Sequence, residues 1–151
     1  MGAAYFYHLT ERPLEETLPT LIARARGADW RVCVRGANLR RMEWLDQQLW
    51  LTGDPFLPHG MAGGDFDADQ PVLLTTEDAI ANNAQCLMII DGAAVTADEV
   101  TRLERVCVLF DGNDPGQLEK ARGQWRELTK AGCSAQYWSE ASGRWEKKAE
   151  A

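Results

Sequence analysis

The chain has 151 residues, of which 45% are hydrophobic and 26% charged, a composition typical of a globular domain with a sizeable core. We therefore expect a single domain that spans residues 1–151. The formal net charge of −7 argues against a protein that wraps nucleic acid by itself, because such binding needs a cationic face that displaces counterions. The charge still allows a local basic patch.

The sequence predicts a cytoplasmic protein without a metal or a cofactor. No apolar run is long enough to span a membrane, and the first residues lack the basic and apolar regions of a signal peptide. The four cysteines stand far apart, and three of them lie in apolar, strand-like runs. This pattern favours buried, inert thiols over metal ligands or nucleophiles. The cysteines are Cys33, Cys86, Cys107 and Cys133.

The first third of the chain predicts two strand–helix units. We predict strands over 5–9 and 30–35 and helices over 14–27 and 39–51. Asn38 is a good N-cap for the second helix. Pro19 conflicts with the first helix, so that either its early turns bend or its true start lies near Thr17.

The rest of the chain continues the alternation of strands and helices. We predict strands over 72–75, 86–90, 105–110, 135–138 and 144–147, a short helix after Thr96, and a long helix from Pro115 to about residue 131. Thr96 and Glu99 match a capping box, and Asp114 is the expected N-cap before Pro115. The segment 76–85 fits a loop or a helical turn equally well.

This alternation predicts an α/β fold of three layers, with a mainly parallel sheet and helices on both faces. The fold would be Rossmann-like but without a phosphate-binding loop. The first strand is followed by Thr10-Glu11-Arg12-Pro13, which has no glycine, and no GxGxxG or GxxxxGK[ST] motif occurs anywhere. A small nucleotide-binding or enzymatic α/β domain remains the alternative.

Few residues suit catalysis or metal binding. His8 lies in a predicted strand and is expected to be packed. His59 could pin its loop through a hydrogen bond or contact a partner, and catalysis is the weakest of the three interpretations. The aspartates at 65, 67 and 69 alternate like the start of a calcium loop, but the glycine and the closing glutamate of that motif are missing.

Large apolar side chains gather in a proline-rich bend after the second helix. Trp50 ends that helix, and Phe56 and Pro58 follow in a stretch that the prolines exclude from the middle of a sheet. Such a segment either folds back as a lid on its own core or offers its side chains to a partner.

The last long helix carries a basic and aromatic patch. Arg122 and Arg126 are one turn apart, and Trp125 is a surface neighbour of Arg122. Guanidinium groups bind carboxylates in pairs of hydrogen bonds, so this patch suits an acidic peptide with an aromatic end. The alternative is a solvated basic face, with Lys120 and Lys130, whose Trp125 is turned into the core.

These segments carry a family resemblance over nearly the whole chain. The sequence resembles the chi subunit of bacterial DNA polymerase III holoenzyme. The most specific match is Leu49-Trp50 followed by Phe56-Leu57-Pro58-His59-Gly60-Met61-Ala62-Gly63, and the opening strand and the helix around Ala121-Arg122-Gly123-Gln124-Trp125 match as well.

The resemblance implies a non-catalytic accessory subunit of the clamp-loader complex, which contacts nucleic acid only indirectly. It implies a surface for the psi subunit or an equivalent partner. It also implies a site for the acidic C-terminal tail of single-stranded DNA-binding protein, where Leu118 stands at a position that usually holds lysine. The implied partner residues are Trp50, Phe56, Pro58 and His59. The implied tail residues are Arg122 and Trp125, with Lys120 and Arg126 as candidate substitutes for the lysine.

Overall fold

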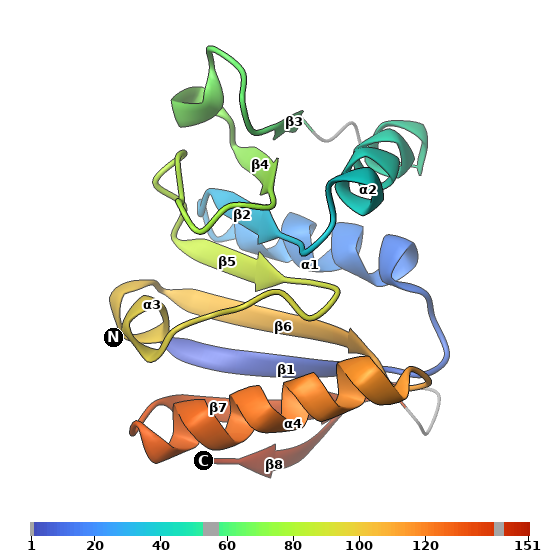
Figure 1. Ribbon diagram of the computed structural model, residues 1–151, viewed down its shortest axis with the longest axis vertical. Coiled ribbons are helices and arrows are strands. Elements are labelled where there is room, and N and C mark those ends of the chain that lie inside the picture. The colour runs from blue at the N-terminus through green and yellow to red at the C-terminus, as the bar shows by residue number, and fades with distance from the viewer. Residues whose placement is uncertain (1, 53–57, 141–143) are drawn as a thin grey trace.

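The computed structural model describes residues 2–52, 58–140 and 144–151 (Figure 1). Within these residues, eight strands form one sheet in the order β3-β4-β2-β5-β6-β1-β7-β8. Every neighbouring pair is parallel except β7 and β8. The strands are β1 (Ala3–Leu9), β2 (Val32–Arg35), β3 (Gly60–Met61), β4 (Val72–Thr75), β5 (Cys86–Ile89), β6 (Arg105–Asp111), β7 (Ser134–Ser139) and β8 (Glu146–Glu150).

Helices cover both faces of this sheet, which confirms the predicted three-layer α/β fold. Helices α1 (Leu14–Gly27) and α2 (Leu39–Thr52) pack on one face, and α3 (Ala97–Arg102) and α4 (Pro115–Lys130) pack on the other. Successive side chains of each strand point to opposite faces of the sheet, so each strand contributes to both helix layers. In β2, Val34 packs with α1 and α2, whereas Cys33 packs in the layer of α3 and α4.

Local sequence signals set several helix starts as predicted. The Thr96 hydroxyl accepts a hydrogen bond from the Glu99 amide at 3.2 Å, and the Glu99 carboxylate accepts one from the Thr96 amide at 3.1 Å, which completes the capping box. Asp114 caps α4 before Pro115. The proposed start of the first helix near Thr17 is wrong, because α1 begins at Leu14 and keeps Pro19 inside it. Tertiary burial of the α1 stripe outweighs the loss of one backbone hydrogen bond.

Three expectations about the chain's connections need correction or completion. The segment 76–85 is a loop of bends and turns. The last strand lies at Glu146–Glu150 rather than at 144–147. Strand β3 was not predicted, because two residues with glycine carry no strand signal of their own and pair only at the sheet edge beside β4. This edge position agrees with the exclusion of the proline-rich segment from the sheet centre.

The cysteines are free thiols, and Cys33, Cys86 and Cys107 are buried as predicted. Burial raises the pKa of the Cys33 thiol to about 12, so that the reactive thiolate is absent at neutral pH. Cys133 is partly buried. Among the described residues, no group of three histidine, cysteine, aspartate or glutamate side chains is arranged to hold a metal ion.

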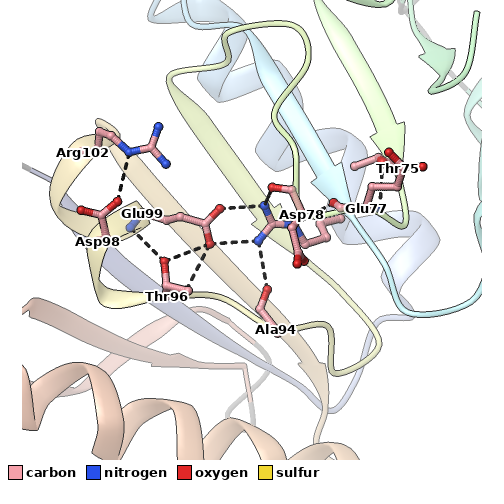
Figure 2. Close-up of polar contacts among 9 residues, drawn as sticks. Thr75, Glu77, Asp78, Ala94, Thr96, Asp98, Glu99 and Arg102 are labelled. Carbon is pink, nitrogen blue, oxygen red and sulfur yellow. Dashed lines mark hydrogen bonds and ion pairs between the residues drawn. The ribbon is translucent and has the colours of Figure 1, made fainter.

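A buried ion pair at the carboxyl end of β2 connects the sheet to its loops (Figure 2). Arg35 Nη1 lies 3.0 Å from Glu99 Oε1, and Arg35 Nη2 lies 2.7 Å from Glu99 Oε2. The same guanidinium donates to three backbone carbonyls, those of Glu77, Asp78 and Ala94. Burial by itself raises the pKa of Glu99, but hydrogen bonds from Arg35 and Thr96 outweigh burial and hold that pKa below its ordinary value.

We expect the substitution Arg35→Met to lower the free energy of unfolding by about 3–5 kcal/mol, because it leaves a buried carboxylate without its cation and three carbonyls without a donor. Urea denaturation measures the change. The matched control is Arg102→Met, which removes an exposed arginine that pairs with Asp98 at the surface and should change stability by about 0.5 kcal/mol or less. Equal stability losses in the two variants would contradict the role given to Arg35.

Candidate functional site

Helix α2 presents more apolar surface than its packing requires. Its inner side is fully buried through Met42, Leu45 and Leu49. Its outer side leaves Trp50 47% exposed and Leu51 77% exposed. Exposed large apolar side chains on a helix end are typical of protein-interaction sites. We refer to Trp50, Leu51, Pro58 and His59 as the α2 surface.

The predicted partner residues of this segment take different positions. Pro58 is exposed, and Phe56 lies outside the described residues. His59 is only 5% exposed. Its Nε2 atom lies 3.0 Å from both the carbonyl oxygen and a carboxylate oxygen of Asp46, and its ring lies 4.2 Å from the Trp50 ring, centroid to centroid. The interpretation that His59 holds its loop in place through a hydrogen bond is therefore confirmed. The buried His59 ring also packs against the ring of Trp50.

The opposite layer carries the basic helix. Helix α4 buries Ala121 and Leu128 and exposes Arg122 and Arg126. Trp125 is half-buried: its ring packs edge-on against Phe6 at 5.4 Å between centroids. Trp125 thus packs on the core while part of the residue stays accessible to solvent. The sequence had left open whether Trp125 belongs to an accessible patch or is turned into the core, and its position is intermediate between these two. We refer to Arg122, Trp125 and Arg126 as the α4 surface.

Two aromatic residues that sequence analysis did not assign to a site extend the α4 surface across the sheet. Tyr137 in β7 lies edge-on to Trp125 at 6.1 Å between ring centroids. His8 in β1 is hydrogen bonded through Nδ1 to the Tyr137 hydroxyl and packs on Phe110 at 5.0 Å. In the sequence, Tyr137 and His8 are marked only by their position in strands that are rich in aromatic residues, 5–9 and 135–138. These strands indicate a shared site only once β1 and β7 are known to be neighbours.

Electrostatics place Arg122 beside this aromatic pair. Burial lowers the pKa of His8 below its ordinary value, and the positive charge of Arg122 lowers it further. Burial raises the pKa of Tyr137, and Arg122 acts in the opposite direction on it. The α4 surface therefore combines a cation, a half-buried indole and a neutral imidazole, an arrangement suited to an anion that carries an apolar side chain.

The other predicted basic residues are less well placed. Lys120 lies about 160° around the helix axis from Arg122, since each residue turns the helix by about 100°. Its side chain lies against Gly92, where an added Cβ would sit 2.8 Å from Lys120 Cδ. Arg126 faces Glu119 at 3.8 Å in an exposed, weak ion pair. Leu118 is partly buried against the core rather than presented to solvent.

The loop between β1 and α1 is occupied by a carboxylate of the chain itself. Backbone amides of Thr10, Glu11 and Arg12 all donate to one oxygen of Glu140, at 3.1, 3.0 and 3.0 Å. Glu140 is 2% exposed. In nucleotide-binding α/β proteins the amides after the first strand bind a phosphate. Here those three amides already have an anionic acceptor.

The protein is an α/β protein with the architecture of nucleotide-binding domains, but the loop after its first strand has no glycine. It exposes an apolar surface on α2 and a basic surface on α4. A family model described as DNA polymerase III chi subunit, HolC, matches residues 1–136, and the chain belongs to this family. The family is a non-catalytic accessory subunit of DNA polymerase III and acts in DNA replication. A search among curated proteins finds no match. None of the described helices is long and apolar enough to cross a membrane.

We expect the stability of the protein to fall as the pH drops below about 6.5, in part because of His8. The folded state holds the pKa of His8 below that of the unfolded chain, so the unfolded chain takes up the proton first, and the loss ends once the pH passes the folded-state pKa. Urea denaturation of the wild type and of His8→Gln between pH 5 and pH 8 measures how the free energy of unfolding depends on pH. The stability of His8→Gln should depend less steeply on pH than that of the wild type. Identical slopes would contradict the assignment.

Proposed function

We propose that this chain connects the clamp-loader complex of the bacterial replicase to single-stranded DNA-binding protein. In this proposal the α4 surface holds the acidic C-terminal tail of that protein. The α2 surface, together with Phe56, holds psi or an equivalent holoenzyme partner. The chain would work in the cytoplasm and contact nucleic acid only through its partners. The observation that supports the tail site best is the exposed Arg122 guanidinium beside the half-buried Trp125 ring.

The chemistry of the α4 surface favours a peptide with carboxylates and an aromatic end. Arg122 can donate two parallel hydrogen bonds to a carboxylate, and such charge-assisted bonds are stronger than neutral ones. Trp125 and Tyr137 supply ring faces and edges for an apolar side chain. The partial exposure of the cation implies an affinity that weakens with salt.

The alternative of a nucleotide-binding enzyme has little support from the geometry. The amides that would hold a phosphate are bonded to Glu140, and the loop has no glycine to let a phosphate approach closer. His8 and His59 are both engaged in packing and hydrogen bonds rather than facing a common cavity.

The α2 surface favours a partner that covers aromatic and aliphatic side chains. The Trp50 ring packs against the buried His59 ring, which restricts the motion of the indole before a partner binds. Binding then costs less side-chain entropy at this residue. Tryptophan is among the residues most often found at the centre of protein interfaces. The two surfaces lie on opposite faces of the sheet, so both partners can bind at once.

We expect the wild type to bind a peptide ending in Asp-Ile-Pro-Phe at about micromolar strength in low salt. Arg122→Ala should weaken that binding at least several-fold, because it removes a charged contact of about 1–3 kcal/mol. Fluorescence anisotropy of a labelled peptide measures both. Lys120→Ala is the matched control, because it removes the same charge from the other side of α4. Unchanged binding in Arg122→Ala, or an equal loss in Lys120→Ala, would refute the site.

We expect Trp50→Ala to abolish capture of the psi subunit while peptide binding stays at the wild-type level. The reason is that Trp50 has the largest of the exposed apolar side chains of the α2 surface, and this surface lies on the other face of the sheet from Arg122. A pull-down with purified psi measures capture. Trp44→Ala is the control on the same helix: Trp44 is 36% exposed but is covered by the Arg41 guanidinium, so capture should persist. Full capture by Trp50→Ala would remove this surface from the proposal.

A further inference from the structure

A cavity of about 330 Å³ lies on the sheet face opposite to the α4 surface. Aromatic rings make up much of its wall, and they come from β1, β7 and the two segments that precede β2 and β8. These residues are Tyr5, Tyr7, Trp30, Trp138 and Trp145. The rings pack with the α1 and α2 layer, whereas Trp125 and Tyr137 pack with the other layer. The cavity therefore lies on the other face from the α4 surface, and its described lining includes no residue of the α2 surface.

Arg105, the first residue of β6, stands in this wall between two rings. Its Cζ atom lies 4.1 Å from the centroid of the Tyr5 ring and 5.3 Å from that of Trp30. Its Nε atom is buried and has no hydrogen-bond partner among the described residues. A buried guanidinium N–H without an acceptor costs free energy, so this atom is a donor that an ion, a water or a ligand in the cavity could satisfy.

The charged side chains that line the cavity, among the residues that the structure describes, all have one sign. Arg24, in the last turns of α1, also lines it, and no aspartate or glutamate does. This holds in a chain whose formal net charge is −7. Burial raises the pKa of Tyr7, whereas Arg105 and Arg24 both act to lower it, which places both positive charges beside the same ring.

We propose that this cavity binds a small aromatic anion, whose planar ring lies against the tryptophan and tyrosine side chains and whose carboxylate or phosphate is held by Arg105 and Arg24. A volume of about 330 Å³ is at the lower end for ligand sites and fits one ring system with one acidic group. Aromatic walls select planar ligands, and guanidinium groups select carboxylates and phosphates.

Two kinds of molecule have this chemistry, a nucleoside monophosphate and an aromatic residue at a free chain end. Isothermal titration calorimetry with dTMP and with N-acetylphenylalanine distinguishes them. Thymidine and N-acetylphenylalaninamide are the neutral counterparts, and each should bind at least tenfold more weakly than its anion. The indole N–H resonance of Trp138, which donates to Gln136 at 3.1 Å, should shift on binding and so locate the ligand.

Arg105→Met keeps the apolar stem of the side chain and removes its charge, and it should weaken binding of the anion at least tenfold. Arg102→Met is the matched control, since it removes an arginine on α3 that is ion-paired at the surface, and it should bind as the wild type does. If Arg105→Met does not fold, Arg24→Met serves instead. Arg24 is exposed, and its loss should weaken binding several-fold without loss of folding.

Binding of either anion with these variant effects supports the site and names its source. Absence of binding by both anions up to about 1 mM, equal binding of the neutral counterparts, or unchanged binding in a folded Arg105→Met would overturn it. In the proposal above the tail peptide is held by Arg122, so its affinity should be unchanged in Arg105→Met and lowered in Arg122→Ala. Binding of N-acetylphenylalanine should show the opposite pattern, so the two proposals can fail separately.

Discussion

The Arg35–Glu99 ion pair is the interaction on which the middle of this structure depends. On the face of the sheet that carries α3 and α4, those helices contact β1, β6 and β7 but leave β2 and β4 to be covered by loops. Arg35 holds these loops in place by bonding the carbonyls of residues 77, 78 and 94 while Glu99 anchors α3 (Figure 2). A charged network thus replaces a helix as the cover of this half of the core.

Burying such a charged network costs desolvation energy, and in return the network fixes the positions of the loops that it contacts. Each donor of the guanidinium has one fixed acceptor, so the loops after β4 and β5 have one arrangement relative to β2. The adjoining loop is fixed in a similar way by Asn82, whose amide donates to the carbonyls of Val32 and Gln70. The rigid sheet then keeps α2, which contacts β3 and β4, far along the strand order from α4, which contacts β6 and β7 (Figure 1). This separation suits a connector with two independent partners.

The sequence predicted what local chemistry determines. The capping box at Thr96, the cap at Asp114 and the continuous apolar runs of β5 and β6 were sufficient to predict the elements and the three-layer fold. It also predicted Arg122 and Trp125 as neighbours, because helical spacing alone brings them together. Features that depend on strand order were not predictable. His8 and Tyr137 are 129 residues apart in the sequence and meet only because β1 lies beside β7. The two-residue strand β3 exists only through its partner β4.

The buried Glu140 carboxylate occupies the backbone donors of the loop after β1. In an architecture shared with nucleotide-binding proteins, the amides of Thr10, Glu11 and Arg12 follow the first strand, where phosphate-binding amides lie, and a side chain of the protein itself accepts their hydrogen bonds. A phosphate group would have to displace this carboxylate before it could reach the three amides.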